Sequence, residues 1–271
     1  MSVILFKLAL AAYLLSTLGY LASLVARRVT AARLSTWVFA LSFFLHTASF
    51  GARCIESGHS PVTNLFEALS FFAWVLAGGY LLLQFRTKTR VLGAFVSPAA
   101  LLVLISASPG IGGPVGLPAM LRSGLVSIHV ILAVAGEALF ALASVAGAMY
   151  LIQDRLIRRK RPSELSRLLP SLGELDGISH VCLLWGFPIL TVGVLAGSAW
   201  ARIVWGSPWQ WDPKQVWTLA AWILYALLLH QRVAIGWKGR KAALLSLLFL
   251  VLLAVAFGVE LVFFPTVHRF L

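Results

Sequence analysis

Four tryptophans lie within the thirteen residues of segment 205–217, which reads Trp-Gly-Ser-Pro-Trp-Gln-Trp-Asp-Pro-Lys-Gln-Val-Trp. Indole rings at this density, with a glycine and two prolines between them, can form a stiff aromatic surface. The second half predicts a helix start, with Asp212 as N-cap, Pro213 at the first helical position and Gln215 as the returning member of a capping box. We therefore expect a structured aromatic loop, residues 202–217, and not the unordered tryptophans of an interfacial belt.

Histidine is the second residue type that could do chemistry here, because imidazole is the usual axial ligand of heme iron. Of six histidines, His129 and His268 are predicted at helix ends on the same membrane face as the aromatic loop. This placement suggests a bis-histidine heme at the outer surface. His230 is predicted at the far end of the helix that follows the loop, about 23 Å from its start, and so cannot reach the same iron.

The other three histidines fit other roles better. His46 is expected to face a neighbouring helix, and His59 to lie in a solvated outer loop. His180 is expected near the inner membrane surface. A pair between His180 and His230 is the less favoured alternative.

The elements that must position these residues are transmembrane helices. Apolar residues make up 60% of the chain and charged residues 11%, against roughly 25% charged in a soluble domain. Runs of roughly 20 apolar residues, enough to cross a bilayer, occur near 3–25, 34–52, 66–85, 91–107, 125–152, 179–201, 215–230 and 242–264. Strand-like alternation is lacking. We predict an all-α polytopic membrane protein, a single integral domain over residues 1–271, with about eight transmembrane helices.

The orientation follows from lysine and arginine. Sixteen of these 22 residues fall in one set of connecting loops, which the positive-inside rule makes cytoplasmic. The basic loop 153–178 is then cytoplasmic, while the aromatic loop, between helices six and seven, and both termini are extracytoplasmic. The first run leads directly into two arginines and is kept as a helix, not a cleaved signal peptide. The net charge of +13 has a membrane explanation, so no nucleic-acid partner is expected.

The two cysteines and two intramembrane glutamates are further residues that could do chemistry. Cys54 and Cys182 are predicted at opposite membrane faces, too far apart for a disulfide, and neither belongs to a C-x-x-C motif. Glu137 and Glu260 each lie eight residues from a candidate histidine. Because ionisable groups inside a membrane are costly, we expect at least one of these carboxyls to tune the polarity of the heme pocket.

Segment 205–217 closely resembles the tryptophan-rich WWD signature of heme-handling proteins, and its surroundings resemble the CcsA (ResC) type of System II cytochrome c assembly. The matching segments are Gly186–Thr191 with Gly193 and Gly197, Leu229–Arg232, Gly236–Arg240, and Gly58–Pro61 with Asn64 and Glu67. Two positions depart from the family pattern. Gln215 stands where the family has glutamate, and His268 is followed by Arg-Phe where the family reads Ser-Tyr.

The resemblance implies a set of heme contacts. Non-covalent heme b would have His129 and His268 as its axial iron ligands. Trp205, Trp209, Trp211 and Trp217 would cradle the ring, and Asp212 would chiefly cap the loop beside it. His230 would serve a second, intramembrane heme site whose other ligand comes from a partner subunit.

The resemblance also implies a function. The chain would deliver heme and support its covalent attachment to apocytochrome c bearing C-x-x-C-H, as one component of a cytochrome c heme lyase. A CcsB/ResB-type subunit would be its partner. Thiol-reducing proteins are further candidate partners. Its location would be the bacterial plasma (inner) membrane, or the thylakoid membrane in a plastid. Two alternatives stay open: a heme carrier or exporter without attachment activity, and a bis-heme electron-transfer subunit.

Overall fold

The computed structural model describes residues 1–26, 28–87, 90–112, 123–159 and 164–263. These residues form helices, and no strand occurs among them. The helices are α1 (Ser2–Ala26), α2 (Val29–Ser57), α3 (Leu65–Thr87), α4 (Gly93–Ala107), α5 (Gly124–Arg158), α6 (Glu164–Leu168), α7 (Leu172–Trp205), α8 (Pro213–Val233) and α9 (Arg240–Phe263). Short 3-10 turns, Arg90–Leu92 and Ser108–Gly110, flank α4.

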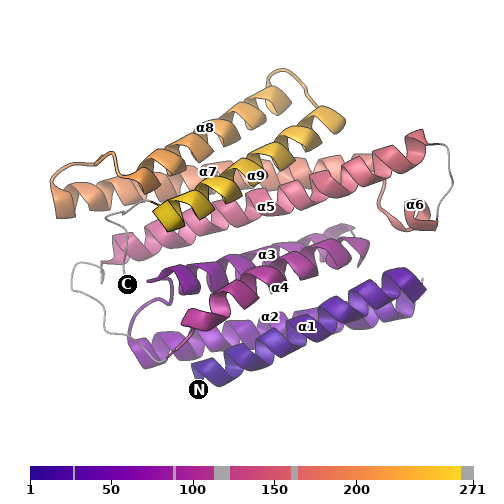
Figure 1. Ribbon diagram of the computed structural model, residues 1–271, viewed down its shortest axis with the longest axis horizontal. Coiled ribbons are helices and arrows are strands. Elements are labelled where there is room, and N and C mark those ends of the chain that lie inside the picture. The colour runs from indigo at the N-terminus through magenta and orange to yellow at the C-terminus, as the bar shows by residue number, and fades with distance from the viewer. Residues whose placement is uncertain (27, 88–89, 113–122, 160–163, 264–271) are drawn as a thin grey trace. The chain divides into compact units, whose positions relative to one another are not determined.

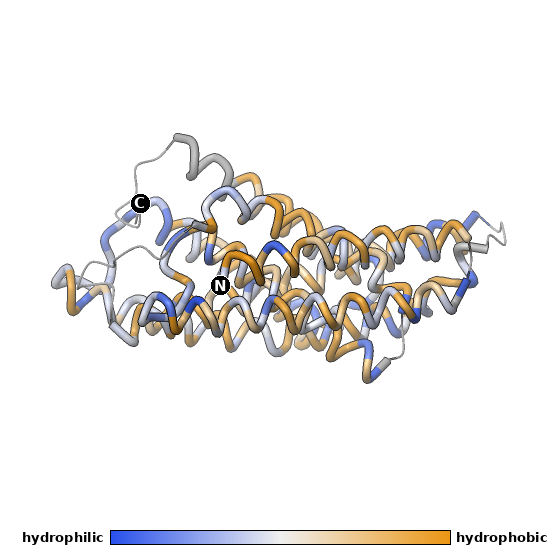
Figure 2. The backbone as a smooth tube through the Cα atoms, turned by 90° about the horizontal axis from the view of Figure 1, so that it is seen from below, coloured by the Kyte–Doolittle hydropathy of each residue, from blue (hydrophilic) through white to orange (hydrophobic). Residues whose placement is uncertain are grey.

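The expected all-α polytopic membrane architecture is confirmed. Within the described residues, seven helical segments are long and apolar enough to cross a membrane, formed by α1, α2, α3, α4 with its flanking turns, α5, α7 and α8. The eighth predicted run falls in α9, which has 24 residues. Figure 2 shows apolar residues along the middle of the helices and hydrophilic residues gathered mainly toward helix ends and connections.

Two helices extend further than the sequence pattern predicted. α5 has 35 residues and α7 has 34, so most of the expected basic loop 153–178 is helical. A complete capping box begins α7: the Ser171 hydroxyl accepts from the Glu174 N–H at 3.2 Å, and the Glu174 carboxylate accepts from the Ser171 N–H at 2.9 Å. This box fixes the helix start well before the apolar run begins.

The chain divides into two compact units, the first made of residues 1–118 and 161–170. In this unit α1 packs along α2, and α4 packs against α1 and α3. Its core holds buried aromatic rings in edge-to-face contact, Tyr13 on Phe39 at 5.2 Å and Phe39 on Tyr80 at 5.3 Å between centroids. The Tyr20 and Tyr80 hydroxyls lie 2.7 Å apart, so the polar ends of two core tyrosines satisfy each other.

The second unit comprises residues 119–160 and 171–271 and carries the aromatic loop. Here α5 packs against α7 and α9, and α8 packs against α7 and α9 (Figure 1). The α5 and α7 backbones approach closely where glycines replace larger side chains. A Cβ built on Gly136 would lie 2.7 Å from Leu190 Cβ, and one on Gly193 would lie 2.6 Å from the Ala133 nitrogen. Small residues at a helix interface are the usual route to close packing in membranes, where no hydrophobic effect drives helices together.

Candidate functional site

The aromatic loop joins α7 to α8 and is fixed at both ends. α7 ends with Gly206 in the left-handed region (φ 76°), whose N–H donates to the Arg202 carbonyl at 3.1 Å. Asp212 is the N-cap of α8, and its carboxylate accepts from the Lys214 N–H at 3.1 Å, with Pro213 next in the chain. The predicted helix start is confirmed. In Figure 1 the end of α7 extends past the start of α8, and the loop runs back beside it.

Polar side chains hold the loop together from within. The Ser207 hydroxyl donates to the Trp209 carbonyl at 2.8 Å, and the Gln210 amide side chain donates to the Ser207 carbonyl at 3.2 Å. The Gln215 side chain accepts from the Gln210 N–H at 2.8 Å. Trp211, which lies between Gln210 and the start of α8, has φ 53°, and this left-handed turn brings the Gln210 amide to the first turn of α8.

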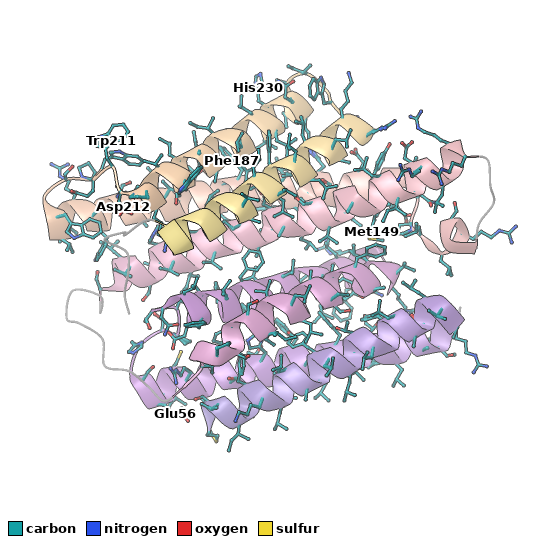
Figure 3. All side chains as sticks on the ribbon, viewed as in Figure 1. Glu56, Met149, Phe187, Trp211, Asp212 and His230 are labelled. Atoms are coloured by element: carbon teal, nitrogen blue, oxygen red, sulfur yellow. The ribbon has the colours of Figure 1, made fainter. Side chains whose placement is uncertain are left out.

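The tryptophans form two edge-to-face pairs. Trp200, buried in α7, packs against Trp205 with centroids 4.9 Å apart. Trp209 and Trp211 lie 5.7 Å apart at 88°. Trp211 is 78% exposed, and Trp217, in the first turns of α8, is 38% exposed. The loop therefore exposes the Trp211 side chain (Figure 3). The half-buried Trp209 packs against it.

His129 lies near the start of α5, and one hydrogen bond fixes its tautomer. Its Nδ1 lies 2.8 Å from the Gly193 carbonyl oxygen on α7. A carbonyl can only accept, so Nδ1 carries a proton, and in the neutral ring Nε2 holds the lone pair. The ring also lies beside Gly197 of α7, eight residues before Trp205 of the aromatic loop. A neutral imidazole with a free Nε2 is the form that ligates iron.

The structure describes only some of the other histidines and glutamates that the sequence analysis singled out. His268 lies outside the described residues. His230 is exposed in the last turn of α8, as the sequence predicted, and His180 is half-buried in α7. Glu137 lies in α5, eight residues after His129. Glu260 lies in α9, outside the part of the chain whose side chains are described.

An acid that the sequence analysis did not single out holds the end of α8 near His230. Asp176 on α7 forms an ion pair with Arg232 at 3.0 Å and accepts from the Gly239 N–H at 2.8 Å. The Asp176 carbonyl accepts a second bond from Arg232. Nothing in the local sequence, Gly173-Glu174-Leu175-Asp176-Gly177, marked this acid as the partner of Arg232.

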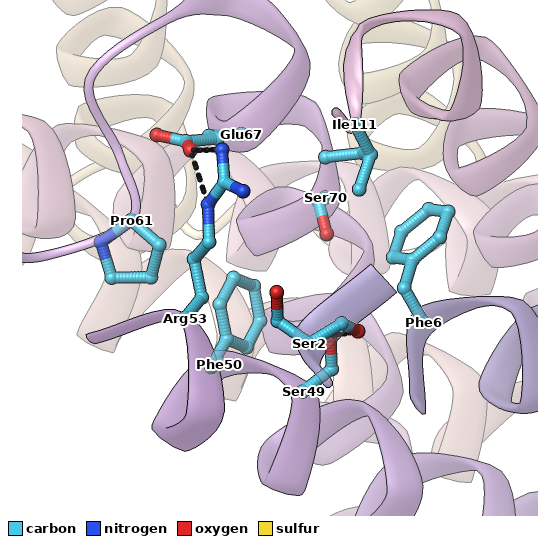
Figure 4. A pocket seen from close by; sticks show the side chains of 9 residues that line it. All are labelled: Ser2, Phe6, Ser49, Phe50, Arg53, Pro61, Glu67, Ser70 and Ile111. Carbon is cyan, nitrogen blue, oxygen red and sulfur yellow. Dashed lines mark hydrogen bonds and ion pairs between the residues drawn. The ribbon is translucent and has the colours of Figure 1, made fainter. Parts of the chain in front are cut away.

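In the first unit, the segment that resembles the family's G-H-x-P-x-x-N-x-x-E pattern is structural. The Asn64 side chain accepts from the Glu67 N–H at 2.8 Å and begins α3. Glu67 pairs with buried Arg53 of α2 at 3.0 Å, and Arg53 also donates to the Gly112 carbonyl at 2.5 Å. The pair borders a small cavity of about 20 Å³ (Figure 4), enough for one water molecule.

His46 and His59 have local partners in the first unit. His46 is fully buried, with Nε2 2.9 Å from the Ser70 hydroxyl and its ring stacked on Phe50 at 4.8 Å. The prediction that it faces a neighbouring helix is confirmed. His59 Nδ1 donates to the Ser60 carbonyl at 3.1 Å.

The cysteines do not pair. Cys54 is exposed near the end of α2, and Cys182 is buried in α7.

Comparison with known proteins gives consistent matches. Residues 62–265 match the family described as cytochrome c assembly protein. The chain is 34% identical over 248 residues to the cytochrome c biogenesis protein CcsA of Parasynechococcus marenigrum, covering 82% of this chain and 81% of the relative. It is 32% identical over 270 residues to the protein of that name from Pyropia yezoensis, covering 84% of each. The protein of that name from Guillardia theta is 31% identical over 221 residues, covering 74% of this chain and 73% of the relative.

Proposed function

Because this chain belongs to the cytochrome c assembly family and is of the CcsA type, we propose that it delivers heme b to apocytochrome c and takes part in covalent attachment. Membership places the chain in cytochrome c biogenesis and heme handling, at a membrane that its apolar helices can span. Delivery would take place on the extracytoplasmic side, where the aromatic loop lies in the proposed orientation.

The observation that carries this proposal is the state of His129. Its proton is held on Nδ1 by the Gly193 carbonyl, and its Nε2 is left for a metal. We assign His129 and His268 as the axial ligands of the heme iron. Trp205, Trp209, Trp211 and Trp217 would lie against the ring, with Asp212 fixing the loop through its cap.

Heme is the cargo of this site, and the protein's part in the chemistry is positioning. Heme would enter from the cytoplasmic side near His230 and be held at the outer site with its vinyl groups accessible. Each cysteine thiol of the C-x-x-C-H motif would add across a vinyl group, forming a C–S bond while the thiol proton goes to the other vinyl carbon. Holding reactants in this geometry lowers the barrier without a side-chain acid or base. The histidine of the apocytochrome would displace one protein ligand.

The proposed setting follows from charge and resemblance. Basic loops would face the cytoplasm and both termini the outside. The membrane would be the bacterial plasma membrane, or the thylakoid membrane in a plastid. A CcsB/ResB-type subunit would supply the second ligand for heme at His230.

The test is an absorbance spectrum and heme stain of the purified protein, wild type beside His129→Ala and His268→Ala. A six-coordinate spectrum that is lost in both variants and restored by added imidazole is expected. His59→Ala is the matched control, because this histidine also donates from Nδ1 to a carbonyl yet lies in the other unit. Wild-type spectra in both ligand variants would overturn the assignment.

A second measurement separates attachment from carriage. Co-expression with an apocytochrome bearing C-x-x-C-H should yield thioether-linked heme that survives denaturing gels. Heme that loads the protein but never becomes covalently linked would favour a carrier, and quinol-dependent reduction of bound heme would favour an electron-transfer subunit.

A further inference from the structure

We propose that Gly197 and Gly193 of α7 are positioning residues for His129, forming a seat that fixes the tautomer and direction of its ring. The inference rests on the proposed function, since a seat for His129 matters only if its Nε2 binds iron. Neither glycine would touch heme. Both would act through the imidazole.

Gly197 makes room for the ring itself. A Cβ built at this position would lie 2.5 Å from His129 Nδ1, 2.6 Å from Cε1 and 3.0 Å from Cγ. Real Cβ atoms do not approach other atoms so closely, so the ring must move if residue 197 carries any side chain. The three atoms nearest to that Cβ all belong to the imidazole, so the displacement falls first on the ligand.

Gly193 sets the distance between the two helices. A Cβ there would lie 2.6 Å from the Ala133 nitrogen and 3.0 Å from the Leu132 carbonyl carbon, both backbone atoms of α5. The absence of that Cβ lets α5 approach until the Gly193 carbonyl reaches His129 Nδ1 at 2.8 Å. The two glycines, four residues apart on one face of α7, therefore have separate tasks.

The Gly193 carbonyl oxygen, as the hydrogen-bond partner of His129 Nδ1, also suits a site that must release heme. A carbonyl oxygen holds the Nδ1 proton without drawing it away, so the imidazole stays neutral. A carboxylate partner would raise the basicity of the ring and strengthen its bond to iron. The second nitrogen of an imidazole points away from the first, so Nε2 is turned away from Gly193.

The first experiment measures stability of the heme-free protein and needs no ligand. Thermal unfolding is compared for wild type, Gly197→Ala, His129→Ala and the double variant. Because the closest contacts of the added Cβ are with the His129 ring, Gly197→Ala should lower Tm in the wild-type background and should not lower it when His129 is already alanine. Gly177→Ala is the matched control, since it lies in the same helix with nothing within 4 Å of an added Cβ.

The second experiment measures the heme site in the same variants. Gly197→Ala should retain heme on the order of tenfold more weakly than wild type, the range of second-shell effects on metal sites, with a shifted Soret band and midpoint potential. Gly177→Ala should match wild type in all three readouts.

The outcomes distinguish a failure of the proposed role of Gly193 and Gly197 from a failure of the proposed heme ligand His129. An equal loss of Tm in both backgrounds, or a wild-type spectrum in Gly197→Ala beside a lost one in His129→Ala, overturns the inference and leaves the proposed function intact. A wild-type spectrum in His129→Ala overturns the proposed ligand and the inference together.

Discussion

The carboxylate of Asp176 on α7 lies 3.0 Å from the guanidinium of Arg232 on α8, and the same oxygen accepts from the Gly239 N–H at 2.8 Å. The Arg232 side chain is only 3% exposed. One acid thus holds the end of α8, which carries His230, and the turn into α9.

Replacing Asp176 with alanine should destabilise the protein by about 3–5 kcal/mol, because Arg232 would be left as a buried charge without its ion-pair partner. The measurement is chemical or thermal unfolding in detergent. Asp154→Ala is the comparison, since its partner Arg158 is 63% exposed and such pairs contribute about 1 kcal/mol or less. Equal losses in the two variants would contradict the role given to Asp176.

The buried pair of the first unit gives a second prediction. Arg53 and Glu67 are 8% and 4% exposed, so Glu67→Ala should cost about 3–5 kcal/mol by removing the carboxylate that pairs with the buried guanidinium. Replacing both residues with apolar ones, Arg53→Met with Glu67→Leu, should recover most of that loss. If the double variant is less stable than Glu67→Ala in the same unfolding assay, the pair has a further role.

Substitution of Trp211 should change the stability of the loop and the retention of heme in opposite directions. Its backbone is in the left-handed region (φ 53°) and its side chain is 78% exposed, so Trp211→Gly should relieve about 1–2 kcal/mol of backbone strain while losing little packing. Heme retention should nevertheless fall, because the accessible ring is gone. Trp211→Phe should keep more of the retention. A Trp211→Gly variant that holds heme as wild type does would remove Trp211 from the site.

Cys54 reports the orientation of the chain. It is exposed near the end of α2, whereas Cys182 is buried. A membrane-impermeant maleimide added to intact cells or right-side-out vesicles should label wild type and fail to label Cys54→Ser. Labelling only in inside-out vesicles would reverse the proposed topology.

The helices were predictable because apolar runs of membrane length leave the backbone no other structure. The extra length of α5 and α7 could not be predicted in this way. The hydropathy pattern marks where the apolar residues end, and a helix can continue beyond that point. The Ser171 and Glu174 box was a readable signal that was missed.

The start of α8 at the aromatic loop could be predicted from the sequence, but the hydrogen bonds within the loop and at His129 could not. Asp212 begins α8 as expected, but Gln215 bonds to Gln210 because of the turn at Trp211. The bond from His129 to Gly193 joins residues 64 apart. It depends on the rotation of two helices about their axes, which one sequence does not specify.

The unequal reach of α7 and α8 has a consequence for how heme would leave. From the level of the Asp176 to Arg232 pair outward, α7 runs about 45 Å to Trp205 and α8 about 30 Å to Pro213. The aromatic loop therefore returns about 15 Å along α7 before α8 begins (Figure 1). The Trp211 side chain in this loop is exposed. If heme binds against Trp211 as proposed, it would leave from a side chain that is exposed among the described residues. Its transfer rate should follow the breaking of iron–nitrogen bonds and the strength of the incoming histidine, and be insensitive to solvent viscosity.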